Sequence, residues 1–111
     1  MGAYEVDRAL ASQLAQRGDA ASAMVRAGLA AIAADDAVER IEALSFARRQ
    51  ADLALHQAVY AANGGSQGLS WRALAGSAGM PWETLYRRYH RRPEKVPPPR
   101  PPDTDEIARL L

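Results

Sequence analysis

The sequence predicts an all-α fold in which a helix-turn-helix unit stands on a long supporting helix, preceded by two N-terminal helices. Three observations predict it: apolar residues recur at three- and four-residue spacing, no stretch alternates between polar and apolar residues, and alanine, the strongest helix former, is abundant among the 111 residues. We divide the chain into an N-terminal helical pair (1–34), a helical domain (36–92) and a proline-rich tail (93–111).

Two helices are expected in the N-terminal part, which is a candidate for oligomerisation. Residues 4–17 form an amphipathic pattern whose apolar row is Val6, Leu10 and Leu14. Gly18 interrupts that pattern, and the carboxylate of Asp19 can cap a second helix. The apolar face that we expect this second helix to bury consists of Val25, Leu29 and Ile32.

A long third helix is expected from Asp36, which has capping-box spacing to Glu39, to about Ala62. It carries two apolar stripes, which means that it is covered from two sides. One stripe consists of Ile41, Leu44, Ala51, Leu55 and Ala58, and the other of Phe46, Leu53 and Tyr60. The second cover is either the N-terminal helices or a second copy of the chain.

Residues 70–91 have the pattern of two short helices joined by a tight turn. Ser70 can cap the first helix, Gly79 suits a left-handed turn position, and Pro81 suits the first turn of the next helix. Small and apolar side chains at Leu74, Ala75, Ala78 and Leu85 would face inward, as in a helix-turn-helix. If Leu85 is buried, Glu83, Arg87 and His90 lie opposite it on the exposed face.

The segment Ala-Gly-Met-Pro-Trp-Glu-Thr-Leu-Tyr-Arg-Arg-Tyr (78–89) resembles the recognition segment of tetracycline-repressor (TetR) family regulators, and it is similar to the helix-turn-helix of resolvases and invertases. The resemblance covers about twenty residues, from Trp71 to Tyr89. It implies that Thr84 and Tyr86 touch the DNA backbone and that Trp82, Glu83 and Arg87 face base edges. The chain departs from the family in three ways: Pro81 replaces the usual serine cap, a proline-rich tail replaces the following long helix, and the ligand-binding domain is absent.

Charge supports a polyanion partner. Residues 1–62 carry six basic and eight acidic side chains, whereas residues 71–100 carry seven basic and two acidic ones. Arginines beside the recognition helix are expected to meet phosphates, and His90 is expected to add a phosphate contact. The complete set of expected DNA-binding residues is Arg72, Trp82, Glu83, Thr84, Tyr86, Arg87, Arg88, His90, Arg91 and Arg92.

Composition excludes several other classes. The chain has no cysteine and only two histidines, which rules out disulfide scaffolds and thiolate metal sites and leaves little for any metal ion. It has neither a phosphate-binding loop ending in Lys-Ser/Thr nor a Gly-x-Ser-x-Gly elbow. We therefore expect neither an enzyme nor a cofactor, metal or small-molecule ligand. The absence of a long apolar run or a signal-like start predicts a cytoplasmic protein outside the membrane, and the preference for arginine over lysine suggests a bacterial, nucleoid-associated one.

The expected function is sequence-specific binding of double-stranded DNA by a transcriptional regulator, with the second short helix in the major groove. A homodimer is expected because paired recognition helices about 34–36 Å apart read pseudo-palindromic sites. The alternative is a protein–protein adaptor that binds RNA polymerase, a toxin or another partner. In that case its binding surfaces would be the two-faced helix and a short C-terminal helix holding Ile107, Leu110 and Leu111.

Overall fold

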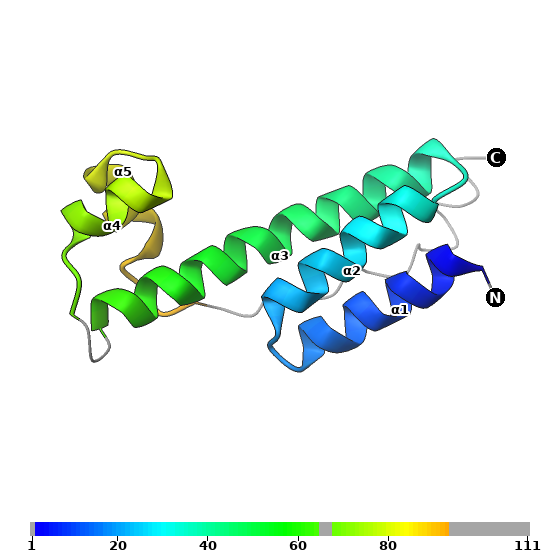
Figure 1. The fold of residues 1–111 in the computed structure, drawn as a ribbon, viewed down its shortest axis with the longest axis horizontal. Coiled ribbons are helices and arrows are strands. Elements are labelled where there is room, and N and C mark those ends of the chain that lie inside the picture. The colour runs from blue at the N-terminus through cyan, green and yellow to red at the C-terminus, as the bar shows by residue number, and fades with distance from the viewer. Residues whose placement is uncertain (1, 65–67, 94–111) are drawn as a thin grey trace, which may run out of the picture.

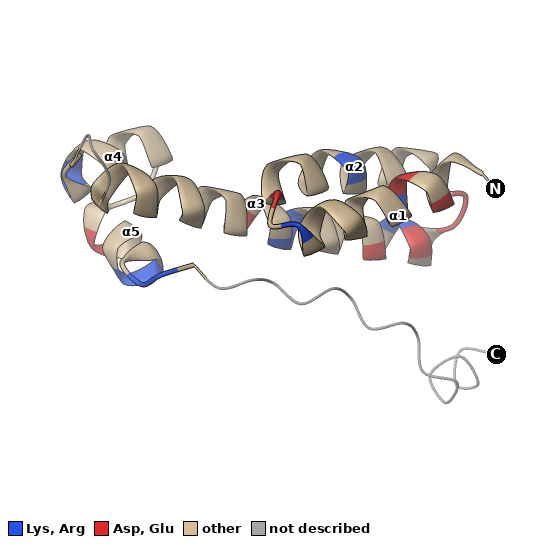
Figure 2. Ribbon diagram, turned by 90° about the horizontal axis from the view of Figure 1, so that it is seen from below, with Lys and Arg blue, Asp and Glu red and all other residues tan. Residues whose placement is uncertain are grey.

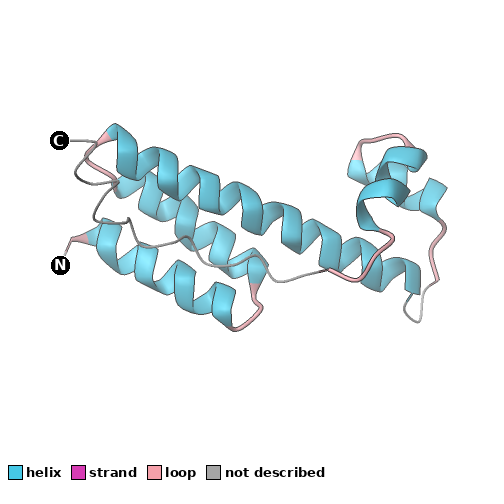
Figure 3. Cartoon of the chain, turned by 180° about the vertical axis from the view of Figure 1, so that it is seen from behind, coloured by secondary structure: helices cyan, strands magenta, loops and turns pink. Residues whose placement is uncertain are grey.

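The computed structural model describes residues 2–64 and 68–93, and within these ranges all regular structure is helical (Figures 1 and 3). The predicted all-α class is therefore confirmed. The proline-rich stretch after Pro93 and the expected C-terminal helix lie outside the described residues. The five helices are α1 (Ala3–Gln16), α2 (Ala20–Ala33), α3 (Ala37–Gly64), α4 (Trp71–Ala78) and α5 (Trp82–Tyr89).

Local chemistry sets the turns between the first three helices. Gly18 has a φ of 83°, a left-handed conformation that glycine adopts without steric cost. The Asp19 carboxylate accepts a hydrogen bond from the Ser22 N–H at 3.1 Å and so caps α2. Asp36 in the same way accepts from the Glu39 N–H at 2.8 Å at the start of α3. Both caps expected from the sequence are confirmed.

Helices α1, α2 and α3 form an antiparallel bundle in which α2 packs against both neighbours (Figure 1). Helix α3 is twice as long as the other two and extends beyond the bundle. Its free half carries α4 and α5 at the far end of the molecule, which measures 50 × 26 × 21 Å. The molecule is therefore a rod with a bundle at one end and a two-helix unit at the other.

The core of the bundle is built from alanines, which corrects the expectation for α2. Its buried residues are all alanines, whereas Val25, Leu29 and Ile32 are 57%, 40% and 81% exposed. Helix α2 is pressed between two helices, and small side chains allow helix axes to approach closely there. The buried residues of α2 are Ala20, Ala23, Ala27, Ala30 and Ala31.

The expected faces of α1 and α3 also need correction. In α1 the buried positions are Tyr4 and Ala11, so the Val6 row lies at the edge of the core. The predicted double cover of α3 is realised in two successive halves, because Phe46 in the first half packs with α1 and α2, whereas Val59 in the second half packs with α4 and α5. Leu53, which lies between them, is also buried. The residues of the predicted stripes that are instead exposed are Ile41, Leu44, Ala58 and Tyr60.

Among the described residues, no helix combines the length and the apolar character that crossing a membrane requires.

Candidate nucleic-acid interface

Helices α4 and α5 are held together by one small apolar cluster. Leu85 is fully buried and packs with Val59 of α3, Ala75 of α4 and Tyr89 of α5. Burying an aliphatic side chain of this size contributes about 1.5–3 kcal/mol, so Leu85 is the principal anchor of α5. The burial of Ala75 and Leu85 is as the sequence predicts, while Leu74 and Ala78 are half-buried. Leu85 and Tyr89 together fix which face of α5 points outward.

Backbone geometry sets the angle between the two short helices. The Ser70 hydroxyl accepts from the Ala73 N–H at 3.2 Å at the start of α4. Gly79 has a φ of 69°, and its N–H donates to the Ala75 carbonyl at 3.0 Å. Pro81 occupies the N-cap position of α5 and provides no side-chain cap. The turn therefore depends on the residue type that adopts a left-handed backbone at the lowest steric cost.

Two residues of α3 position the C-terminal end of α5. The Tyr89 hydroxyl donates to the Asp52 carboxylate at 2.7 Å, and the His56 Nε2–H donates to the Arg91 carbonyl at 2.6 Å. Burial raises the pKa of Tyr89, and the hydrogen bond and negative charge of Asp52 raise it further. Neither Asp52 nor His56 could be predicted as a partner from the sequence, because neither residue belongs to a local motif.

All the expected site residues lie at the surface of the unit. Eight are exposed, and Thr84 and His90 are half-buried. In α5, Glu83 and Arg87 lie on the side opposite Leu85, as the helical period requires. The eight exposed residues are Arg72, Trp82, Glu83, Tyr86, Arg87, Arg88, Arg91 and Arg92.

Aromatic rings link this surface to α4. Tyr86 meets Trp71 edge-on at a centroid distance of 5.3 Å and stacks on His90 at 4.6 Å. The His90 Nδ1–H donates to the Tyr86 carbonyl at 2.7 Å, so this nitrogen is not free to meet a phosphate. Arg72 lies 5.4 Å from the centre of the Trp82 ring, close enough for a cation–π contact between the two helices.

The basic side chains of the unit are available for a ligand. Among the residues that the structure describes, Arg26–Asp7 is the only ion pair, so Glu83 and Arg87 do not pair despite their spacing. Figure 2 shows that the basic residues at the end of α5 lie far from most of the acidic residues, which gather on the bundle. The rod therefore has a basic end.

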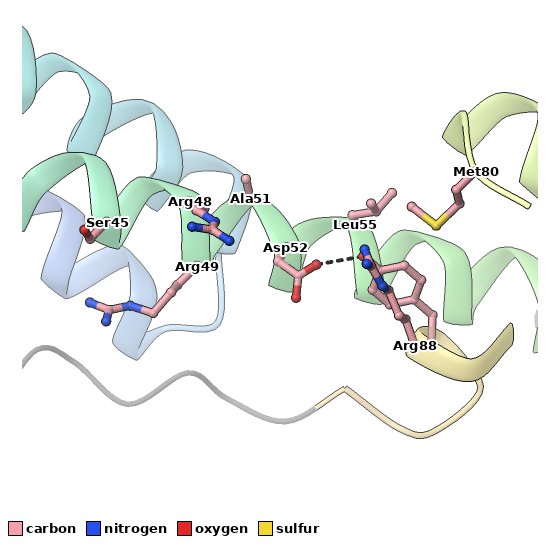
Figure 4. Close-up of a pocket in the computed structure, with 9 residues that line it drawn as sticks. Ser45, Arg48, Arg49, Ala51, Asp52, Leu55, Met80 and Arg88 are labelled. Carbon is pink, nitrogen blue, oxygen red and sulfur yellow. Dashed lines mark hydrogen bonds between the residues drawn. The ribbon is translucent and has the colours of Figure 1, made fainter. Parts of the chain in front are cut away.

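An open cleft of about 940 Å³ lies where α5 overhangs α3 (Figure 4). Among the residues that line it are Arg48 and Arg49 of α3 and Arg88 of α5. Arg88 thus lies on the flank of α5 nearest to α3, apart from Arg87. Asp52 also lines the cleft, although one of its oxygens accepts the Tyr89 hydroxyl.

Comparison with known proteins identified no relative of the chain. The chain matches no protein-family model, and no similar protein was found among curated sequences or solved structures.

Proposed function

We propose that the chain binds double-stranded DNA through the exposed face of α5 and acts as a transcriptional regulator in a bacterial cytoplasm. The observation that supports the proposal is the exposed face of α5. Arg87 and Glu83 project away from the buried Leu85, and the flanking arginines have no acidic partner among the described residues. Arginine and glutamate can read base edges in the major groove, and arginine also binds phosphates.

Each part of the unit has a role in this proposal. Helix α5 enters the major groove with Arg87 toward the bases. Arg91 and Arg92 follow the helix and neutralise phosphates, while Arg72 on α4 meets the backbone on the other side. Asp52 and His56 are positioning residues, because they hold the end of α5 on the long helix without facing the DNA.

The second candidate is a protein–protein adaptor, and a specific observation favours it. Aliphatic side chains of α2 and α3 are exposed on the bundle, which is unusual for a protein surface unless it meets a partner. In that case the arginines of α5 would have no part in binding. The two candidates therefore differ in what removal of those arginines does.

The test measures fluorescence anisotropy of a labelled pool of random 30-base-pair duplexes at several salt concentrations. We expect the logarithm of the binding constant of the unchanged chain to fall linearly with the logarithm of the salt concentration. Each phosphate contact that a variant loses should make this slope shallower by about 0.9. The triple variant Arg87→Ala, Arg91→Ala, Arg92→Ala should bind at least tenfold more weakly and with a shallower slope.

A matched control removes positive charge from the bundle instead. Arg8 and Arg17 are exposed on or next to α1, far from α5, so the variant Arg8→Ala, Arg17→Ala should keep most of the affinity. The control removes two charges and the α5 variant three, so an equal loss of affinity per charge removed would assign the binding to net charge and overturn the role of α5. Absence of binding by the unchanged chain would favour the adaptor.

A further inference from the structure

The outer surface of α2 is apolar and has no cover among the described residues. Val25 and Ile32 are 57% and 81% exposed. The only charged residue of α2, Arg26, pairs with Asp7 of α1 and so belongs to another side of the helix. Helix α3 adds further exposed aliphatic side chains to the bundle surface, at Val38, Ile41 and Leu44. The exposed row along α2 itself carries no charge, and an uncharged apolar row fits another apolar protein surface.

The spacing along α2 has the form of a helix–helix seam. Ala21, Val25, Gly28 and Ile32 follow one another at intervals of four, three and four residues, the repeat of two helices that pack along their length. The seam alternates small residues with β-branched ones. Apart from the backbone of α2 itself and the residues next to Gly28, no atom of the described residues lies within 4 Å of the position that a Cβ on Gly28 would occupy, so the space above that glycine is open in this part of the chain.

We propose that α2 pairs antiparallel with α2 of a second copy of the chain. A two-fold axis between residues 26 and 27 sets Val25 opposite Gly28 of the second copy and Ile32 opposite its Ala21. Each large side chain then meets a small residue, and the same two contacts recur on both sides of the axis, as a two-fold interface requires. The row on α2 is therefore complementary to the same row running in the opposite direction, which indicates that a second copy of the chain covers it. The inference does not depend on DNA binding.

The first test is the mass of the purified full chain by sedimentation equilibrium over a range of concentrations. We expect a dimer of twice the 12.0 kDa chain mass. Ile32→Arg, at the most exposed position, should weaken the dimer roughly 100-fold or more because it places an unpaired charge in the seam. The control Val6→Arg changes an equally aliphatic exposed residue on α1 and should leave the dimer intact. Circular dichroism checks that both variants stay folded.

The second test fixes the register and uses the absence of cysteine from the chain. Chains with Ala21→Cys are mixed with chains with Ile32→Cys and exposed to mild oxidation. The proposed pairing predicts a disulfide between the two kinds of chain and little linkage of either kind with itself, since like positions lie about 16 Å apart along the paired helices.

Three outcomes would overturn the proposal. A chain that stays monomeric shows that the surface has another occupant, such as a partner protein. A dimer that survives Ile32→Arg uses another face. Linkage of each variant only with itself indicates parallel packing.

Discussion

Tyr89 and Asp52 make the contact that ties α5 to the long helix at the level of single side chains. Their hydrogen bond spans 2.7 Å, and the Tyr89 side chain is buried. A single sequence gives no sign of this pair because the two residues are 37 positions apart and belong to different helices. The exposed positions of Glu83 and Arg87, in contrast, could be predicted, because they follow from the period of one helix.

Removing the hydroxyl should weaken both stability and its pH dependence. Tyr89→Phe is expected to lower the free energy of unfolding by about 0.5–1.5 kcal/mol at pH 7. The pKa of Tyr89 is raised above 10.0, so the neutral phenol is favoured in the folded state. Its contribution is complete below pH 10 and is lost as the pH rises through the folded pKa. Urea unfolding of the natural chain should therefore show a fall above pH 10 that is smaller in the variant, in which only Tyr4, whose pKa burial also raises, still contributes.

Gln50 is a polar side chain in the apolar core. It is 1% exposed, and neither atom of its amide has a hydrogen-bond partner among the described residues. Because an unsatisfied buried amide is costly, Gln50→Leu should raise the free energy of unfolding by about 1–3 kcal/mol in urea titrations. A loss of stability would show that the amide has a partner in solution.

At the scale of elements, the turn between α4 and α5 gives the sharpest prediction. Gly79→Ala places a Cβ on a left-handed residue and should cost about 1–2 kcal/mol of stability. Gly76 lies within α4, and apart from the backbone of that helix and the adjacent residues no described atom lies within 4 Å of the Cβ position there, so Gly76→Ala should instead be neutral or stabilise by up to about 1 kcal/mol. Equal effects of the two substitutions in thermal unfolding would contradict the role of the turn.

Helix α2 shows where periodicity fails as a guide to burial. Its alanines and its larger aliphatic residues both recur at helical spacing, so the sequence is compatible with the burial of either of two faces of α2. Size favours burying Val25, Leu29 and Ile32, but a helix held between two neighbours buries the face that lets their axes approach. Choosing between these faces requires knowing how many helices cover α2, and this is a property of the whole fold. Element boundaries were predictable, because caps such as Asp19 and Ser70 act locally.

At the scale of the whole molecule, the rod shape links the proposed dimer to the proposed function. Ala27, beside the proposed axis, packs in one cluster with Phe46 of α3, and the α4–α5 unit packs on Val59. Phe46 and Val59 are thirteen residues apart on α3, which corresponds to about 20 Å along the helix. Each copy of α5 therefore lies about 20 Å from the two-fold axis, and the two copies lie on the order of 40 Å apart along the rod. This is close to the 34–36 Å between successive major grooves on one side of the duplex.

That spacing predicts how a binding site tolerates insertion. We expect two inverted half-sites whose centres are about one helical turn apart. Inserting five base pairs between them should abolish joint occupancy of both half-sites in gel-shift titrations, because it rotates one half-site to the opposite side of the duplex. Inserting ten base pairs should return both half-sites to the same side of the duplex. Binding should still stay weak, because the half-sites would then be farther apart than the two copies of α5 in the dimer. Equal binding to all three spacings would show that the proposed dimer does not bind both half-sites at once.

Selection of binding sites from random duplexes tests the central claim, DNA recognition by α5, most directly. The full chain is taken through several rounds at about 100–150 mM salt, in parallel with the Arg87→Ala variant. We expect the natural chain to enrich one inverted repeat. We expect the variant to show a relaxed preference at one base of each half-site and a loss of about 1–3 kcal/mol in binding free energy. Retention of duplexes without enrichment, or no retention at all, would contradict it.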